Sequence, residues 1–240
     1  MPRRLLRVLV TLLALAVIAV AADLAARTWA TDRVASQLRT EYRLTQDPEV
    51  SVAGGSFLWQ ALRGRFEDVT VTVPQLTTQD DLVVRDLRVR LPEVDVPTSV
   101  LTGGAGTVDV AGGTVRARVA YADLAQKASA GGLDVTLARD GDAVRAGATV
   151  RVFGLGVDLG VTGRPVLKGS DVELEPVSAE VAGASVPLGR AEQLIEAAGF
   201  GGFTFPLDGV PPQVRLQGLQ VADDGLVVTG TVTPSAVRVG

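Results

Sequence analysis

The sequence contains no cysteine, no histidine and a single methionine among 240 residues. Without cysteine there are no disulfides and no thiol nucleophiles, and without histidine there is neither imidazole acid–base chemistry nor a Ser-His-Asp triad. Zinc sites built from Cys or His ligands are excluded for the same reason. The net charge of −4 argues against a nucleic-acid partner, which normally requires a basic face.

Two pairs of neighbouring aspartates are the remaining candidates for catalysis. Asp223-Asp224 come directly before a glycine, which is typical of a turn between strands, and Asp80-Asp81 lie in a polar loop. A catalytic carboxylate pair also needs a pocket and a partner acid or base, and the sequence indicates neither. We therefore predict that the protein is not an enzyme and uses no metal or other cofactor.

The N-terminus carries the one long apolar run of the chain. Arg3, Arg4 and Arg7 precede an apolar stretch at residues 8–22, which ends in small residues. A positive flank followed by such a stretch is typical of a secretory signal, although a membrane span normally needs roughly 20 residues. We predict that residues 1–22 are a signal peptide or an uncleaved signal anchor. In either case the rest of the chain lies in the cell envelope, outside the cytoplasmic membrane, anchored or secreted.

An amphipathic helix is predicted at residues 23–43, continuous with the apolar run. Its apolar residues recur every fourth position: Ala26, Ala30, Val34, Leu38 and Tyr42. We favour a core helix laid on a sheet over a helix lying on a membrane surface. The polar face mixes both signs of charge, which does not suit a surface of anionic lipid.

Alternating valines, 27 glycines and many turn residues predict a β-rich body. Pro74 and Pro92 are expected to end two strands, and Gly112-Gly113 and Asp140-Gly141 to form hairpin turns. A short helix or turn is expected at residues 57–62, and short helices at residues 121–130 and 187–198. Strand runs joined by tight turns favour antiparallel pairing. We predict an α+β fold, in which a long curved antiparallel sheet and the long helix form a single domain over residues 23–240.

Aromatic residues make up 4% of the chain and gather in two clusters. These clusters could plug the ends of the core, or line the mouth of an apolar groove that takes an acyl chain. A groove of this kind needs no reactive residue, because each buried lipid CH₂ contributes roughly 0.8 kcal/mol. The candidate lipid-binding residues are Phe57, Leu58, Trp59, Leu62, Phe66, Phe200, Phe203 and Phe205.

Four arginines are placed in alternation on two predicted strands. Arg88 and Arg90 share one strand, and Arg116 and Arg118 share another, so each pair puts positive charge on one face. We favour a solvated outer face over a contact with phosphate headgroups.

The order of several short motifs resembles the LmeA-like phospholipid-binding proteins of the actinobacterial cell envelope. Phe57-Leu58-Trp59-Gln60, followed by Gly64-Arg65-Phe66 and Val69, resembles the family's F-L-x-Q…G-R-[FY]…V element. The sequence at residues 119–124, VAYADL, is like the family's V-x-Y-x-D-L. A proline-rich stretch at residues 206–212 precedes a strand pair that contains Asp224-Gly225-Leu226. Ser56 stands where the family often has proline.

The resemblance implies a fold similar to tubular lipid-binding (TULIP) domains, in which a curled sheet wraps a long helix and encloses an apolar groove. It implies phospholipid as the partner, with phosphatidylinositol as one candidate, at a membrane, and a supporting role in lipoglycan assembly such as lipomannan elongation. It implies no catalytic residues and names no protein partner. The alternative is a non-catalytic envelope adaptor that binds a protein through a sheet edge or an aromatic cluster.

Overall fold

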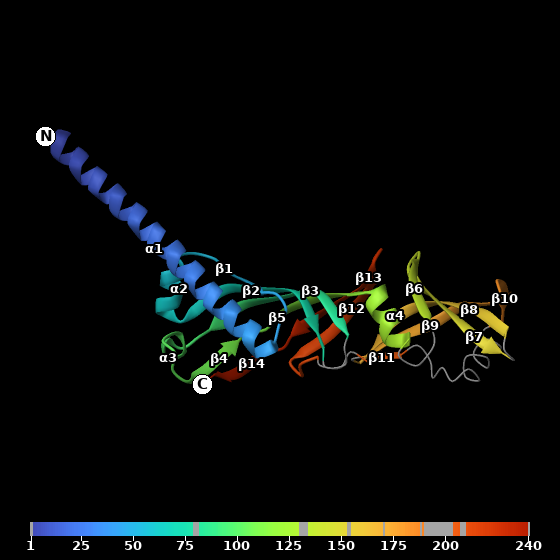
Figure 1. Ribbon diagram of the computed structural model, residues 1–240. Helices are drawn as coiled ribbons and strands as arrows, with labels where there is room; N and C mark the ends of the chain where they lie inside the picture. The colour runs from blue at the N-terminus through green and yellow to red at the C-terminus, as the bar shows by residue number, and fades with distance from the viewer. Residues whose placement is uncertain are drawn as a thin grey trace. The chain divides into compact units, whose positions relative to one another are not determined.

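The computed structural model describes residues 2–78, 82–129, 134–152, 155–169, 171–187, 189, 204–206 and 210–239. It confirms the predicted α+β class, with a long N-terminal helix and large antiparallel sheets (Figure 1). The chain forms two compact units. Unit 1 comprises Met1–Thr72, Val89–Gly113 and Pro234–Gly240, and unit 2 comprises Val73–Arg88 and Thr114–Thr233.

Unit 1 contains the long helix and a small group of strands. Its elements are α1 (Pro2–Tyr42), β1 (Glu49–Ala53), α2 (Phe57–Arg63), the first part of β2 (Arg65–Thr77), the last part of β3 (Val83–Asp95), α3 (Thr98–Leu101), β4 (Gly106–Val110) and β14 (Ser235–Val239). The strands pair in the order β1-β2-β3, and β4 pairs with both β3 and β14.

Helix α1 has two halves with different surroundings. Every side chain from residue 11 to residue 22 is exposed, and this half projects as a lone helix in Figure 1. Within Thr11–Tyr42, a stretch of 18 residues is apolar enough to cross a membrane, and none of that stretch is buried. Further along, Ala26 and Ala30 pack against the core of unit 1, and Ala35 is buried. The predicted continuity of the apolar run with an amphipathic helix is confirmed.

The core of unit 1 is built around two phenylalanines. Phe57 of α2 and Phe66 of β2 are 7% and 6% exposed, and their ring centroids lie 5.8 Å apart. Val94 of β3 completes the buried cluster, which also contacts the two alanines of α1. The first aromatic cluster of the sequence therefore supplies the contact that holds α1 and α2 on the sheet.

Unit 2 contains two groups of strands and one helix. Its elements are the remaining parts of β2 and β3, β5 (Gly113–Ala120), α4 (Tyr121–Ser129), β6 (Val135–Asp140), β7 (Ala143–Val152), β8 (Leu155–Lys168), β9 (Asp171–Val181), β10 (Ala184–Val186), β11 (Thr204–Pro206), β12 (Val214–Val221) and β13 (Gly225–Val232). One group pairs in the order β3-β5-β13-β12, and a six-stranded sheet has the order β10-β9-β8-β7-β6, with β11 on β9.

The core of unit 2 forms where α4 meets both groups of strands. Helix α4 contacts β6 and β13, and β12 contacts β8. The buried residues of this core are Leu82, Val119, Tyr121, Leu124, Val144, Ala146, Val172, Leu174 and Leu226. The predicted helix at residues 121–130 is confirmed as α4, whereas most of the one predicted at residues 187–198 lies outside the described part of the chain.

The two prolines do not end their strands, which corrects the sequence prediction. Pro74 lies beyond Thr72, the last β2 residue that pairs with β1. Proline has no backbone N–H to donate, and at this position β1 offers no residue to accept such a hydrogen bond. Pro92 is followed by Glu93 at a φ of 55°, and β3 continues through this kink to Asp95. Proline is accepted in these strands because Pro74 lies outside the pairing with β1 and Pro92 lies at a bend.

The predicted Gly112-Gly113 hairpin is also wrong, because β4 pairs with β14 and β3 rather than with β5. The Ala111 N–H donates to the Glu93 carbonyl at 3.2 Å, and a Cβ on Gly113 would lie 2.4 Å from the Arg90 carbonyl oxygen. The chain therefore continues along β3 instead of reversing. The predicted Asp140-Gly141 turn is confirmed, with Gly141 at a φ of 63°.

Candidate functional site

The six-stranded sheet of unit 2 has one apolar face. Leu137, Ala146, Val161 and Ala179 stand opposite one another across β6, β7, β8 and β9. Two positions along, Val135, Ala148, Leu159 and Val181 form a second such row. Directly opposed residues share a face, and side chains alternate between faces along a strand, so both rows lie on the same side.

Along β7, β8 and β9, burial of this face falls from the first row to the second. In the first row, Ala146 is 1% exposed and Val161 is 4% exposed. In the second row, Leu159 and Val181 are only half-buried, as is Val157 one row further along β8. On β6 the order is reversed, because Val135 of the second row is 7% exposed and Leu137 of the first row is half-buried. On β7, β8 and β9 the face is filled in the first row and partly uncovered beyond it. Branched aliphatic side chains left in this state offer a surface for an apolar ligand.

The opposite face of the same sheet is polar. Arg145 pairs with Glu180, and the Thr149 hydroxyl donates to Asp158 at 2.8 Å. The Thr162 hydroxyl donates to Asp140 at 3.3 Å. Because water and ion pairs satisfy this face, an acyl chain has only the other face to lie on.

The F-L-x-Q element builds the local structure of α2. Gln60 is 3% exposed, and its side-chain oxygen accepts from the Glu67 N–H at 2.9 Å while its amide donates to the carbonyls of Ala53 and Gly55. Gly64 ends the helix at a φ of 66°, a left-handed conformation that favours glycine. This element therefore fixes which side of α2 faces the core.

The other side of α2 carries large apolar side chains into solvent. Leu58, Trp59 and Leu62 are 46%, 51% and 72% exposed. The Arg63 guanidinium lies over the Trp59 ring, 4.3 Å from its centroid. Positions 58, 59, 62 and 63 share one side of a helix, whereas positions 57, 60 and 61 share the other. The helix is thus apolar on both sides, which is unusual for a helix that faces only water.

The eight predicted lipid-binding residues are accordingly found in different places. Phe57 and Phe66 lie in the core of unit 1, and Leu58, Trp59 and Leu62 lie on the outer side of α2. The backbone of Phe205 pairs with Val172 as part of β11. Phe200 and Phe203 lie outside the described residues. The apolar rows of the six-stranded sheet were missed, although the alternation at residues 157–161 had predicted the strand.

A shallow pocket of about 310 Å³ opens beside the end of α2 in unit 1. Its lining residues are Leu62, Arg63, Gly64, Asp95, Val96, Pro97, Thr98 and Asp109. Asp95 is bound by Arg65, whose Nε donates at 2.7 Å. With two carboxylates in the lining, the pocket does not suit an anionic headgroup.

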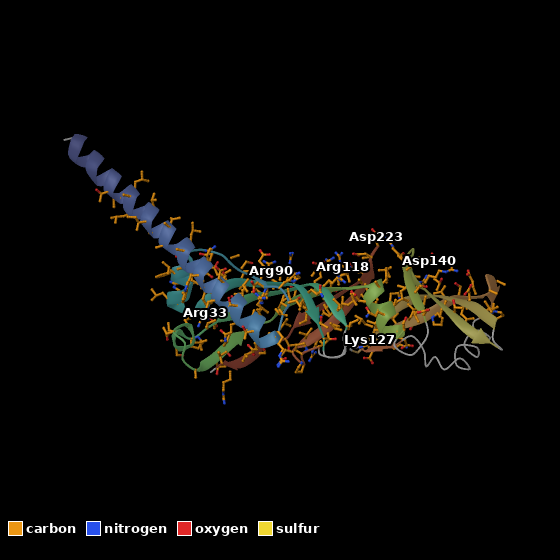
Figure 2. The ribbon with its side chains drawn as sticks, in the orientation of Figure 1. Arg33, Arg90, Arg118, Lys127, Asp140 and Asp223 are labelled. Atoms are coloured by element: carbon orange, nitrogen blue, oxygen red, sulfur yellow. The ribbon has the colours of Figure 1, made fainter. Side chains whose placement is uncertain are left out.

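Two of the four alternating arginines are already paired with carboxylates. The Nε of Arg90 donates to Asp68 at 2.8 Å, and Arg118 donates to Asp224 at 3.0 Å (Figure 2 labels both arginines). Arg88 and Arg116 form no ion pair with any residue in the described part of the chain. The neutralisation of Arg90 and Arg118 favours the predicted solvated outer face.

Asp68 supplies a pH prediction for unit 1. Hydrogen bonds from Arg90 are the main cause that lowers the pKa of the Asp68 carboxyl below its ordinary 3.8. A pKa that folding lowers contributes stability above the unfolded value, and this stability is lost as the pH falls through the folded value. We expect Asp68→Asn to show a smaller loss of stability than the wild type on acidification below pH 3.8. Urea midpoints over a pH series check this, and parallel curves would contradict it.

The aspartate pair at residues 223–224 forms the predicted turn between β12 and β13. Asp223 pairs with Arg139, and its side chain is 90% exposed. Asp224 binds Arg118, and its carbonyl accepts from the Tyr121 N–H at 3.1 Å. The Tyr121 hydroxyl donates to the Ala222 carbonyl at 2.9 Å, so the tyrosine of the VAYADL motif holds α4 on this turn. These carboxylates have structural partners.

Comparison with known proteins places these features in a family. The family model described as LmeA-like phospholipid-binding matches residues 21–231. The chain belongs to this family. The match covers the F-L-x-Q element, the VAYADL motif and both units, which confirms the resemblance seen in the sequence. The α+β architecture with its open antiparallel sheets is consistent with a TULIP-like fold. No curated protein and no solved structure matches the chain.

Proposed function

We propose that the protein is a membrane-anchored phospholipid-binding protein that holds or carries lipid against the apolar face of its six-stranded sheet. The observation that carries this proposal is the one-sided sheet, with half-buried Leu159, Val181 and Val157, in a chain of a phospholipid-binding family. Each lipid CH₂ removed from water on this face contributes roughly 0.8 kcal/mol, and no reactive group is required.

The anchor in this proposal is the first half of α1. Its leucines and valines from residue 12 to residue 20 are all more than half exposed. No protein surface covers them in the described part of the chain, so the bilayer is the environment that fits them. The stretch continues without a break into the helix that packs on unit 1, which favours an anchor over a cleaved signal. The anchor keeps the lipid-binding face near its source of phospholipid.

The lipid and the pathway follow the family resemblance. Phosphatidylinositol is the candidate ligand, and support of lipomannan-type lipoglycan assembly in the cell envelope is the candidate role. Holding a lipid for other proteins is a task that needs an apolar face and no catalytic apparatus. The protein accordingly acts as a non-enzymatic supplier or holder of phospholipid.

Photo-crosslinking tests the lipid-binding face. The full chain is reconstituted in liposomes that contain phosphatidylinositol with a diazirine in its acyl chain, and the crosslinked peptides are identified by mass spectrometry after irradiation. We expect crosslinks within β7, β8 and β9, in addition to those of the anchor. Crosslinks confined to α1, with none in the sheet, would contradict the proposal.

A further inference from the structure

The outer side of α2 is fixed beside the point where the apolar half of α1 ends. Asp23 of α1 accepts hydrogen bonds from the N–H groups of Phe57 at 3.0 Å and Leu58 at 2.8 Å. It also accepts from the Ser56 hydroxyl at 2.7 Å. One turn later, Arg27 donates to the Gly55 carbonyl at 2.8 Å. The start of α2 is therefore attached to α1 at the first charged residue after the apolar run.

The length of the apolar run places this attachment at a membrane boundary. A hydrocarbon core about 30 Å thick takes about 20 helical residues at 1.5 Å each. Leu5 and Leu6 extend the apolar run of residues 8–22 at its start, with Arg7 in the first turn where its side chain can reach the headgroups, and Leu24 extends it at its end, so a span of about 20 residues ends near Leu24. The side chain of Leu24 is 55% exposed, like those of the run before it. Asp23, and with it the start of α2, thus lies where hydrocarbon gives way to headgroups.

The side chains on the outer side of α2 suit that level. Leu58 and Leu62 are apolar, and tryptophan, the residue at position 59, is enriched at membrane interfaces. Arg63 covers the Trp59 ring, and the helix contains no acidic residue, so its charge complements anionic phospholipid. Trp29, the other tryptophan, is 71% exposed and lies six residues after Asp23, about 9 Å further along the helix axis.

We propose that α2 is a membrane-docking helix, whose Leu58, Trp59 and Leu62 enter the interface of the bilayer that α1 spans. The occupant of this surface is the anionic phospholipid bilayer itself. The docked helix gives unit 1 a second contact with the membrane and restricts its tilt about the anchor. The inference rests on the proposed anchoring by α1 and is independent of lipid binding by the six-stranded sheet.

Single-tryptophan variants of the full chain test the docking. Trp29→Phe leaves Trp59 as the only tryptophan, and Trp29 is exposed enough for the change to leave the fold intact. The chain is reconstituted in liposomes of phosphatidylcholine and phosphatidylglycerol, with bromine on the acyl chains in one preparation. We expect brominated lipid to quench the Trp59 emission, and aqueous iodide to leave most of it. Strong quenching by iodide, with none by brominated lipid, would overturn the proposal and would also be the result if a protein partner used this surface.

Introducing a carboxylate at two exposed positions gives a test variant and its matched control. In the Trp29→Phe background, Leu62→Glu puts a carboxylate on the docking side and is expected to abolish quenching of Trp59 by brominated lipid. Tyr42→Glu is also an exposed site, 61% exposed, but lies about 28 Å along the helix axis from Asp23, and is expected to change nothing. If Leu62→Glu left the quenching intact, the apolar side chains of α2 would not be the docking element.

Flotation separates this proposal from the anchoring on which it rests. A chain that floats with liposomes while Trp59 stays accessible to iodide is anchored but not docked. A chain that does not float with liposomes has no anchor, and both inferences then fail together. Photo-crosslinking to the six-stranded sheet is measured on the same proteoliposomes, so that lipid binding is assessed separately from both.

Discussion

Replacing Phe66 with alanine is expected to lower the free energy of unfolding by about 3–5 kcal/mol, the usual cost of removing a buried aromatic ring. Phe66 is 6% exposed and packs against Phe57 and Val94, so the change leaves a cavity between α2 and the sheet. Folded proteins are stable by only about 5–15 kcal/mol, so this loss is a large part of the total. Urea denaturation followed by circular dichroism, on the full chain in detergent micelles, measures it.

Trp59→Ala is the matched control, since it removes a larger ring from the same motif. Trp59 is 51% exposed, and we expect its loss to change the free energy of unfolding by less than about 1 kcal/mol. Equal losses for the two variants would show that Trp59 packs into the core after all. Phe66→Leu, which keeps most of the volume, is expected to fall between the two.

The contrast between Phe66 and Trp59 shows which features of this segment can be predicted from the sequence. The pattern of residues 57–66 predicted a short helix or turn and a dense aromatic cluster, and the structure has a helix there with the cluster around it. The pattern could not show which residues of the cluster are buried in the core and which are exposed. That division depends on Gln60, whose bonds to Ala53, Gly55 and Glu67 set the rotation of α2, and these bonds cross from one element to another.

The predictions at Pro92 and at Gly112-Gly113 are wrong for a related reason. Pro92 was expected to end a strand because it lacks a donor, but the kink at Glu93 carries β3 past it to a new partner. Gly112-Gly113 was expected to reverse the chain, but the second glycine is small so that β5 can lie close to Arg90. Local rules give the conformations that a residue allows, and strand pairing selects among them.

The candidate lipid-binding face could not be derived from the sequence because it exists only across strands. Each of β6, β7, β8 and β9 shows apolar alternation by itself. The rows that contain Leu159 and Val161 arise from the pairing register of four strands, and the register is not local information. Which residues of these rows are buried, and which are left partly open, depends further on the packing of α4 and β12.

Leu159→Glu is expected to lower acyl-chain crosslinking to the six-stranded sheet at least about tenfold. A tenfold change corresponds to about 1.4 kcal/mol, and the loss of contact with two lipid CH₂ groups, at roughly 0.8 kcal/mol each, is enough to produce it. The carboxylate adds a further penalty, because an acyl chain laid over it would remove the charge from water. The yield of crosslinked β7, β8 and β9 peptides, measured by mass spectrometry, checks this expectation.

Ser178→Glu is the control for Leu159→Glu, because it introduces the same charge on the polar face of the same sheet. Ser178 is exposed and stands opposite Thr162, whose side chain lies on the polar face, so crosslinking should stay at the wild-type yield. Leu159→Ala serves if the glutamate disturbs folding, since it shortens the contact with lipid without adding charge. Wild-type yields in all three variants would place the lipid elsewhere. A loss confined to the two Leu159 variants would identify the apolar rows as the surface on which the lipid lies, because the two glutamate variants are matched in charge, sheet and unit.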